Sequence, residues 1–569
     1  MFAHIHLISS LLLAVLCLAQ DVPFRPCPLL GPRFPIPKHT IGSPIIREGT
    51  KNLTDALDAY VAAADGDFGP ITPNTTSFSV TFFSTEESNS TEPFFYEYHH
   101  SSNPNTSVDA HTVLPVGDLT TMFTVWLFLI AAGEEHWSDP VSRWIPELCT
   151  NSTSTNHWDE ITLGDLAGHL GGIGRYSRSE EQLDSIFAPY LQGKGNITEF
   201  ACETGLGDCD RAQFLSFVRK HAPVFGPAST PIFSNTGFIL LAYALEQISG
   251  RSFSDMLDSR ILRPLNMTST SLLQPRANQS IPFFSPSTLP SHEAPFNGLL
   301  SSIHDLSTAL RAILSSHLLT PAVTNRWLKP VSHTSNRANS VGRPWEIFSL
   351  LVNGQPSPVI PVYQVRGNVD AYTSHIGLVP DYGVGFAIVA IDGTGNADMN
   401  AIADVLAVAM IPALEENAIM QASRALSGTY SAVEVGEGEN KTTVELTVAK
   451  AVNSSAGLSI SNFTLGGEDL RAVYARLQGI EPQNLSMRLY PTDLVQETEM
   501  GTNMAFRAVF QDMAALADAG TPTCETWRYV DKLQYRGVAL DEFVFEMKGD
   551  DAVGVEVSAL QMRLRRTVE

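Results

Sequence analysis

The hydrophobic pattern of this chain changes character near residue 426. Before that point, strand-like and helix-like stretches alternate. Residues 78–83 combine β-branched and aromatic side chains, and residues 386–391 form a short apolar run typical of a strand covered on both faces. Residues 119–132 and 397–422 have the length and apolar content of helices, the second interrupted by Pro412. This mixture predicts an α+β domain over residues 45–426.

After residue 426, strand-like stretches dominate. Apolar and polar residues alternate at Val444, Leu446 and Val448, and the pattern returns at Val553, Val555 and Val557 after a turn at residues 548–551. A period of two is typical of a sheet with one buried face. We therefore expect residues 427–569 to form a small antiparallel, barrel-like β domain.

The N-terminus predicts the compartment. Residues 7–18 form a mostly apolar run of signal-peptide length, and the small residue Ala19 suits a cleavage site. The run is too short to span a bilayer, so we expect no membrane association. Residues 1–19 are thus predicted to be a signal peptide, and residues 20–44 a Pro-rich extended arm. The mature protein is expected outside the cell or in the secretory-pathway lumen.

The charge balance excludes nucleic acid as a partner. Thirty-six Lys and Arg against 60 Asp and Glu give a formal net charge of −24, so no basic surface is expected to neutralise phosphates. Charged residues make up only 17% of the chain, below the roughly 25% of an average soluble domain. Glycans offer another source of solubility. The predicted glycosylation sites are the sequon residues Asn52, Asn74, Asn89, Asn105, Asn151, Asn196, Asn266, Asn278, Asn440, Asn453, Asn462 and Asn484.

Five cysteines follow the predicted signal peptide: Cys27, Cys149, Cys202, Cys209 and Cys524. An odd number leaves at least one thiol unpaired within the chain. Cys202 and Cys209 frame a short loop, and we expect a local disulfide between them. The pairing of the other three stays open. The spacing does not suit a zinc site, and no metal is predicted.

Several segments resemble serine β-lactamase-like proteins, the family of class C β-lactamases, penicillin-binding proteins and related esterases. Residues 132–148 resemble the segment after the nucleophile helix, and residues 161–173 resemble the next one, with Gly171 in place of a Ser. Residues 296–306 are similar to the family's Gly-Gly-Leu-x-Ser helix start. The loop between the two closely spaced cysteines and the sequence Leu-Tyr-Pro-Thr at residues 489–492 resemble secreted fungal members.

The resemblance implies a β-lactamase/transpeptidase-like fold, with an antiparallel sheet flanked by helices and a helical subdomain. It also implies hydrolysis or acyl transfer on a small-molecule ester, amide or lactone-like ligand, without a cofactor. The family's chemistry uses a Ser-x-x-Lys at a helix start, a Tyr-x-Asn that shuttles protons, and a Lys-Thr-Gly strand that binds substrate.

This chain departs from the family at the nucleophile helix and at the tyrosine. The pattern Gly-Ser-x-Thr-Lys aligns with residues 117–121, so Asp118 stands at the nucleophile position and Thr121 at the lysine position. Phe233 replaces the tyrosine, while Asn235 is retained. Loss of a nucleophile alone cost about 10⁶ in rate in one protease. We therefore expect no Ser-Lys acyl-enzyme chemistry.

The third element departs as well. Val365, Arg366 and Gly367 align with the Lys-Thr-Gly triplet, so the lysine has become a valine. Arg366 has three open interpretations: an ion pair with Asp118, recognition of an anionic substrate group, or a side chain that points to solvent. Asn235 either hydrogen-bonds within the site or supports a turn. Asn235, Arg366 and Gly367 are the predicted substrate-binding residues.

Three more side chains bear on the site. Asp118 is expected to cap the following helix, where backbone N–H groups lower its pKa and make it a poor general base, although it could still orient a cation or polar substrate. His375 could titrate near neutral pH, but we favour a solvent-facing strand residue. His169 is expected to be structural.

The sequence thus predicts a secreted β-lactamase-like protein that lacks the family's usual catalytic groups and is not a β-lactamase. Two alternatives remain open. One is a re-purposed enzyme of a fungal biosynthetic pathway, which would catalyse cyclisation, dehydration, isomerisation or hydrolysis. The other is a non-catalytic binding protein. No Gly-x-Ser-x-Gly elbow, phosphate-binding loop or His-Glu-x-x-His motif is found in the sequence.

Overall fold

The chain divides into two compact units in a computed structural model. The described residues are 27–87, 93–100, 108–149, 156–175, 190, 209–277, 279, 281, 284, 290–351, 359–394, 399–435, 441–449, 456–515 and 524–567. Residues 38–350 and 361–413 form what we call the sheet unit. The barrel unit comprises the described parts of residues 1–37, 351–360 and 414–569.

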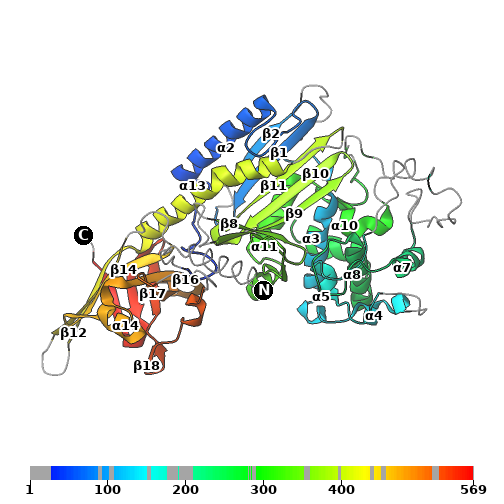
Figure 1. The fold of residues 1–569 in the computed structure, drawn as a ribbon. Coiled ribbons are helices and arrows are strands. Elements are labelled where there is room, and N and C mark those ends of the chain that lie inside the picture. Colours follow the sequence, from blue (N-terminus) through cyan, green and yellow to red (C-terminus); the bar gives the residue numbers. More distant parts are fainter. Residues whose placement is uncertain are drawn as a thin grey trace, which may run out of the picture. The chain divides into compact units, whose positions relative to one another are not determined.

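The sheet unit is built on an eight-stranded sheet in the order β2-β1-β11-β10-β9-β8-β7-β6 (Figure 1). The strands are β1 (Thr76–Ser84), β2 (Phe94–Tyr98), β6 (Ser332–His333), β7 (Asn339–Val341), β8 (Glu346–Leu351), β9 (Val359–Val369), β10 (Tyr372–Val379) and β11 (Val384–Asp392). The central strands pair antiparallel. Every residue of β1 and β11 is buried, which confirms both strands predicted in this region.

Helices cover the sheet. α2 (Pro44–Ala63) and α13 (Asn400–Leu426) cross it together, and α11 (Ile303–Leu314) packs on β1 and β11 (Figure 1). The helical prediction for the last part of this unit is confirmed, but the interruption at Pro412 is wrong, because α13 continues through it. A proline removes one backbone hydrogen bond, and the buried neighbours Met410 and Leu414 help to hold the helix on both sides.

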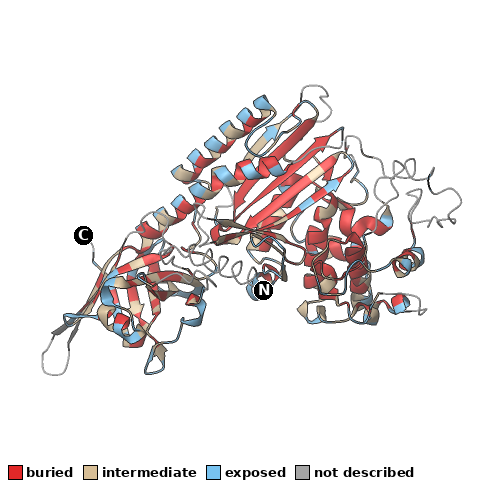
Figure 2. Ribbon diagram, in the orientation of Figure 1, coloured by how far each residue is buried: buried red, intermediate tan, exposed pale blue. Residues whose placement is uncertain are grey.

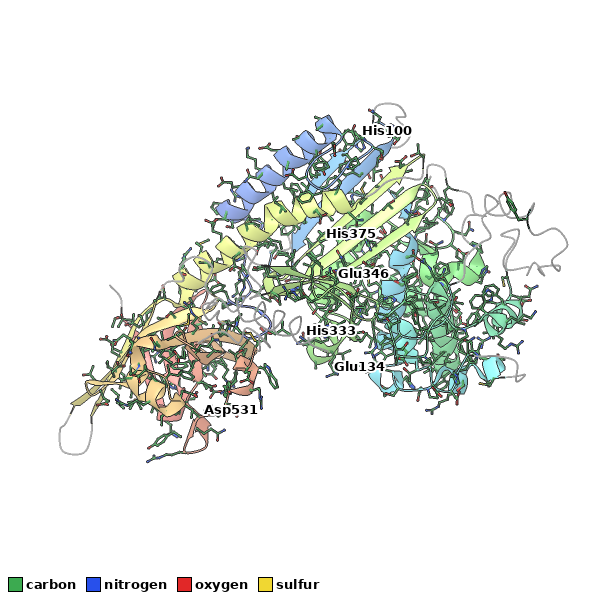
Figure 3. All side chains as sticks on the ribbon, viewed as in Figure 1. His100, Glu134, His333, Glu346, His375 and Asp531 are labelled. Atoms are coloured by element: carbon green, nitrogen blue, oxygen red, sulfur yellow. A yellow bond between two sulfur atoms is a disulfide. The ribbon has the colours of Figure 1, made fainter. Side chains whose placement is uncertain are left out.

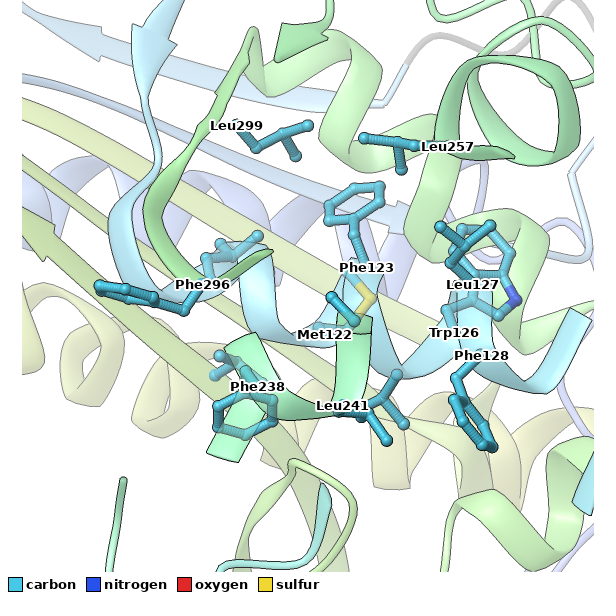
Figure 4. Close-up of a cluster of buried hydrophobic side chains, with 14 of the residues drawn as sticks. Met122, Phe123, Trp126, Leu127, Phe128, Phe238, Leu241, Leu257, Phe296 and Leu299 are labelled. Carbon is cyan, nitrogen blue, oxygen red and sulfur yellow. The ribbon is translucent and has the colours of Figure 1, made fainter. Parts of the chain in front are cut away.

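A group of mostly short helices lies beside the sheet. They are α3 (Thr120–Ala131), α4 (Val141–Trp144), α5 (Leu163–Ala167), α7 (Arg211–Lys220), α8 (Asn235–Ser249), α9 (Phe253–Leu257), α10 (Ala294–Asn297) and α12 (Pro321–Trp327). The strands β3 (Leu114–Pro115), β4 (Ser271–Leu272) and β5 (Leu299–Ser301) form a small separate sheet. α3 is buried on almost all sides, as predicted, and α8, α9 and α10 surround it (Figures 2 and 4).

The barrel unit closes on itself. Its sheet runs β13-β12-β22-β21-β20-β17-β16-β14, and a further pairing joins β13 to β14. The strands are β12 (Gly428–Val435), β13 (Lys441–Val448), β14 (Leu458–Leu465), β16 (Leu485–Thr498), β17 (Gly501–Asp512), β20 (Glu542–Lys548), β21 (Asp551–Val557) and β22 (Met562–Arg566). The small elements are β15 (Glu468–Asp469), α14 (Leu470–Gln478), β18 (Gln534–Tyr535) and β19 (Val538–Ala539). The predicted antiparallel β domain is therefore confirmed.

The predicted alternation holds in one strand of the barrel and fails in another. Val444, Leu446 and Val448 are all buried, as the pattern of β13 predicts. In β21, however, Val553 is exposed whereas Val555 is buried. The register of β20 and β21 shifts between Glu546 and Met547, and such a bulge places an extra residue outside the ladder.

One disulfide settles part of the cysteine pairing. Cys27 and Cys524 are bonded within the barrel unit, and Cys149 is a free, exposed thiol. Cys209 is also disulfide-bonded, but its expected partner Cys202 lies outside the described residues, as does the predicted signal peptide. In the described part of the chain, no helix has the length and apolar character needed to cross a membrane.

Candidate functional site

The turn that carries Asp118 is pressed against the sheet. Gly117 adopts a φ of +59°, and a Cβ there would lie 2.7 Å from the backbone nitrogen of Asn368. A Cβ on Gly367 would lie only 2.0 Å from the Val116 carbonyl oxygen. Glycine at both positions therefore permits the close approach of the turn to β9. Gly367 shapes the site with its backbone and offers no side chain to a ligand.

Hydrogen bonds fix this turn at the start of α3. The Ser374 hydroxyl of β10 donates to the Val116 carbonyl at 2.7 Å. The Thr120 hydroxyl donates to the Gly117 carbonyl at 2.8 Å and accepts the Leu299 N–H of β5 at 3.2 Å. Buried side chains of α3 hold the helix behind the turn (Figure 4). The position of Asp118 is therefore set by strands and helices on several sides.

Asp118 does not cap α3, so that prediction is wrong. A 3₁₀ turn, η2 (Gly117–Leu119), precedes the helix, and the residue at the N-cap position is Leu119 in a helical conformation without a side-chain cap. Among the described residues, no hydrogen bond reaches the Asp118 carboxylate. A cap needs an extended backbone that turns the side chain back toward the N–H groups, and the 3₁₀ turn removes that geometry.

The pKa of the Asp118 carboxyl is therefore raised rather than lowered. Burial raises it to about 6, because desolvation penalises the charged form. Arg175 opposes this shift, and the carboxylates of Glu293 and Glu346 add to it. The prediction of a depressed pKa is wrong because it assumed the cap hydrogen bonds that the 3₁₀ turn removes. A carboxyl with this pKa can exchange a proton near neutral pH.

The side chains at three other positions of the family's catalytic motifs make structural contacts. The Thr121 hydroxyl donates to the Asp118 carbonyl at 2.7 Å, a bond within the helical backbone. Val365 is buried in the hydrophobic core. The Phe233 ring has two neighbours, the Arg175 guanidinium 4.8 Å from its centroid and the His169 ring 5.7 Å away. None of these three side chains offers a base near neutral pH.

Asn235 is buried at the first position of α8. Its side-chain oxygen accepts the backbone N–H of the next residue, Thr236, at 3.0 Å. The residue therefore supports the start of the helix, one of the two interpretations left open by the sequence. A direct role in binding a ligand stays a prediction.

Arg366 does not pair with Asp118, so the first interpretation of that residue is wrong. Its guanidinium binds the Glu346 carboxylate at 2.8 Å and lies 3.4 Å from the Asn400 side-chain oxygen. The side chain is 48% exposed. Successive residues of a strand point to opposite faces, so Arg366 and Gly367 face opposite sides of β9. The alternation of side chains along β9 directs Arg366 toward solvent. The sequence had left this direction open.

His375 is buried and does not face solvent, so that expectation is also wrong. Only 4% of it is exposed, and its Nε2 donates to the Gln364 side-chain oxygen at 3.1 Å. Burial, with a smaller contribution from Arg366, lowers its pKa to about 3, so it is neutral at physiological pH. Figure 3 labels His375 and Glu346 on the sheet. A buried position was not visible in the sequence because β10 is covered on both faces.

His169 is held by the backbone. Its Nε2 donates to the Pro344 carbonyl at 2.9 Å, and burial lowers its pKa. Its ring also lies 5.8 Å from that of Phe238. These contacts suit the structural role expected for this residue.

Sequence reasoning missed two side chains at the site, the carboxylate of Glu293 and the amide of Asn297. Glu293, 3% exposed, immediately precedes α10 and raises the pKa of Asp118. Its carboxylate accepts the Asn297 side-chain N–H at 3.3 Å. α10 packs on η2 and α3, which brings this pair to the Asp118 turn. The only signal in the sequence was their position just before and within the segment at residues 296–306.

Comparison with known proteins places the chain in a family. A sequence model described as "Beta-lactamase" matches residues 91–410, more than half of the chain. The chain belongs to the β-lactamase family. A second model, described as "Beta-lactamase-like-like, C-terminal domain", matches residues 418–568 of this family member.

Fungal relatives match this β-lactamase family member along nearly its whole length. A "Beta-lactamase-like protein" of Arthroderma benhamiae is 28% identical, over 94% of this chain and 95% of the relative. A "Probable hydrolase clz13" of Cochliobolus lunatus is 24% identical, over 95% of this chain and 91% of the relative. Among solved structures, a D-stereospecific amidohydrolase from Streptomyces sp. is similar over 62% of this chain and 97% of its own, with 21% identity and a TM-score of 0.46.

Within the described residues, no group of three or more His, Cys, Asp or Glu side chains is arranged to hold a metal ion.

Proposed function

We propose that this β-lactamase family member does not act through a serine acyl-enzyme and that the fold instead presents Asp118 to a small-molecule ligand. One observation carries the proposal: each position that the family uses for acyl transfer holds a side chain without the required chemistry. Asp118 stands at the nucleophile position, the Thr121 hydroxyl is bonded to the helix backbone, and Val365 is buried. Neither Thr121 nor Val365 can take a proton from a nucleophile at neutral pH, and Asp118 stands where the nucleophilic serine itself would be.

The experiment is covalent labelling with a fluorescent penicillin. The natural protein is compared with the variant Asp118→Ser/Thr121→Lys/Phe233→Tyr/Val365→Lys, and circular dichroism checks that both are folded. We expect no label on the natural protein. Labelling confined to the variant would support the proposal further, because it would show that the site is still open. Stoichiometric labelling of the natural protein would overturn it.

A second candidate function is a re-purposed enzyme of fungal biosynthesis. The observation in its favour is the Asp118 pKa of about 6, which suits a general acid or base near neutral pH. The test is turnover of chromogenic esters, amides and lactones by the natural protein and by Asp118→Asn. The candidate requires turnover that Asp118→Asn abolishes, with a pH profile that bends near about 6. Turnover that survives the substitution would exclude Asp118 as the acting group.

We also propose that the protein is secreted and glycosylated. The Cys27–Cys524 disulfide suits an oxidising compartment. The sequon residues Asn52 and Asn266 are exposed, whereas the Asn462 side-chain N–H is donated to Glu445 at 2.7 Å. After expression through a secretory pathway, we expect Asn52→Gln and Asn266→Gln each to remove one glycan's mass and Asn462→Gln to remove none. A protein retained in the cell without glycans would contradict this proposal.

A further inference from the structure

A small cavity lies between the start of α8, the end of α7 and two loop segments of the sheet unit. Its volume is about 10 Å³, at the lower end of the roughly 10–15 Å³ that one water molecule needs. Apolar side chains form part of its wall, among them Trp158, Ile173 and Phe217, each 3% exposed. A cavity lined only by such side chains would stay dry, so the polar groups of the wall decide what it holds.

The Thr236 hydroxyl is the polar group of this wall that most needs a partner. Thr236 is the second residue of α8, lines the cavity and is 2% exposed. Its backbone N–H is donated to the Asn235 side-chain oxygen at 3.0 Å, whereas its Oγ1 has no hydrogen-bond partner among the described residues. A buried hydroxyl that forms no hydrogen bond is costly. The adjoining cavity is the place from which a partner can reach it.

Two further polar side chains border the same cavity. The Nδ1 of His221, which follows α7, lies 3.1 Å from the Phe217 carbonyl oxygen. A carbonyl oxygen can only accept, so Nδ1 carries the proton and Nε2 of the neutral ring is an acceptor. The Asn156 side-chain nitrogen donates to the His221 carbonyl at 2.8 Å, which brings its amide to the end of α7. The wall therefore offers a hydroxyl, an imidazole nitrogen and an amide.

From this arrangement we infer that the cavity binds one ordered water molecule, which hydrogen-bonds to the Thr236 hydroxyl and bridges it to the His221 and Asn156 side chains. A buried water typically makes about three hydrogen bonds, which is the number of polar side chains at this wall. The volume excludes a larger ligand. The inference goes beyond the proposed function and does not rest on it, because Asp118 takes no part in it.

The water links α7 to the segment that aligns with the family's Tyr-x-Asn motif. On one side of that segment, the Ser234 hydroxyl donates to the Gly174 carbonyl at 2.9 Å. Thr236 lies two residues further on, and a bridge from its hydroxyl to His221 adds a second attachment. The water would thus help to hold the backbone at the start of α8, where Asn235 lies.

The direct test is a crystal structure of the full-length protein at a resolution that shows ordered water. We expect one water peak in the cavity, within hydrogen-bond distance of the Thr236 Oγ1 and of His221 or Asn156. Thr236→Val keeps the shape of the side chain and removes the hydroxyl, so its crystal structure should lack the peak. Thr236→Ser keeps the hydroxyl and should keep the peak, which leaves a variant to examine if Thr236→Val does not fold.

Urea unfolding gives an independent measurement with a matched control. Thr324 of α12 is 3% exposed, its Oγ1 also has no partner among the described residues, and it does not line this cavity. Thr324→Val removes a hydroxyl without a partner, so it should leave stability unchanged or raise it. Thr236→Val removes a hydroxyl bonded to water, so we expect it to raise the unfolding equilibrium constant about fivefold.

Two results would overturn the inference. One is a well-resolved crystal structure of the natural protein without a water in the cavity. The other is a Thr236→Val variant as stable as the natural protein or more stable, as expected for the control. Neither measurement involves a penicillin or a ligand of Asp118, so a failure of this inference is distinguishable from a failure of the proposed function.

Discussion

At the scale of single residues, Asp118 shows how a rule based on local sequence can predict a pKa shift in the wrong direction. An aspartate before an apolar helix is a good N-cap in sequence. The structure instead places it inside a 3₁₀ turn, where its carboxylate receives no cap hydrogen bond from the described residues and burial dominates. The sequence predicted a stabilised carboxylate, whereas burial destabilises its charged form. The packing of neighbouring residues holds the side chain at the site.

The free energy of unfolding should reflect the cost of burying the Asp118 charge. The ordinary pKa of 3.8 rises to about 6 on folding, so the group stabilises the fold at pH values below about 4 and this contribution is lost as pH rises through about 6. Asp118→Asn removes the buried charge. We expect the variant to be more stable than the natural protein by about 1–3 kcal/mol near pH 7.5.

The measurement is the free energy of urea unfolding of both proteins at several pH values, followed by tryptophan fluorescence. The advantage of Asp118→Asn should shrink steadily as pH falls from about 7 toward about 4. A variant less stable than the natural protein at pH 7.5 would mean that the charged form has a stabilising partner, which would contradict the raised pKa.

At the scale of elements, the site depends on the contact between the Asp118 turn and β9. We predict that Gly367→Ala disrupts it, because the added Cβ would lie 2.0 Å from the Val116 carbonyl oxygen, an atom of the backbone that cannot rotate away. Overpacking of this kind costs about 1–3 kcal/mol. The thermal unfolding midpoint should therefore fall by several degrees.

Gly226→Ala is the matched control. A Cβ at that position would have no heavy atom within 4 Å, and its φ is not in the left-handed region. Its unfolding midpoint should stay close to that of the natural protein. Equal midpoints for Gly367→Ala and the control would show that the turn is not packed on β9 as described.

The elements themselves were largely predictable. α3 and β11 follow from strongly apolar runs, whose burial needs no knowledge of partners, and β1 follows from its β-branched and aromatic side chains. The errors occurred where a neighbouring element decided the outcome. The bulge between β20 and β21 exposes Val553, and burial around Pro412 allows α13 to continue through it.

At the scale of the whole molecule, the Cys27–Cys524 disulfide joins residues 497 positions apart. Closing so long a loop lowers the entropy of the unfolded chain more than closing a short one, although the effect grows only with the logarithm of loop length. We predict that Cys27→Ser/Cys524→Ser lowers the free energy of unfolding of the barrel unit by about 2–5 kcal/mol. Chemical unfolding of the natural protein and of the double-serine variant, both without reductant, measures this difference.

Cys149→Ser is the control, because that thiol is free and exposed. Its unfolding should match that of the natural protein, and reductant should still destabilise it. A double-serine variant as stable as the natural protein would show that the long-range bond does not constrain the unfolded chain.

The sequence by itself determined the family and the two kinds of domain, and it predicts that the family's catalytic groups are missing, because these depend on local motifs and on the period of apolar residues. Only the tertiary structure decided what surrounds Asp118. Arg175, Glu293 and Glu346 are far apart along the chain, and their influence on the pKa of Asp118 depends on helix packing and strand register. The charge of the site, unlike its motif, is a property of that packing.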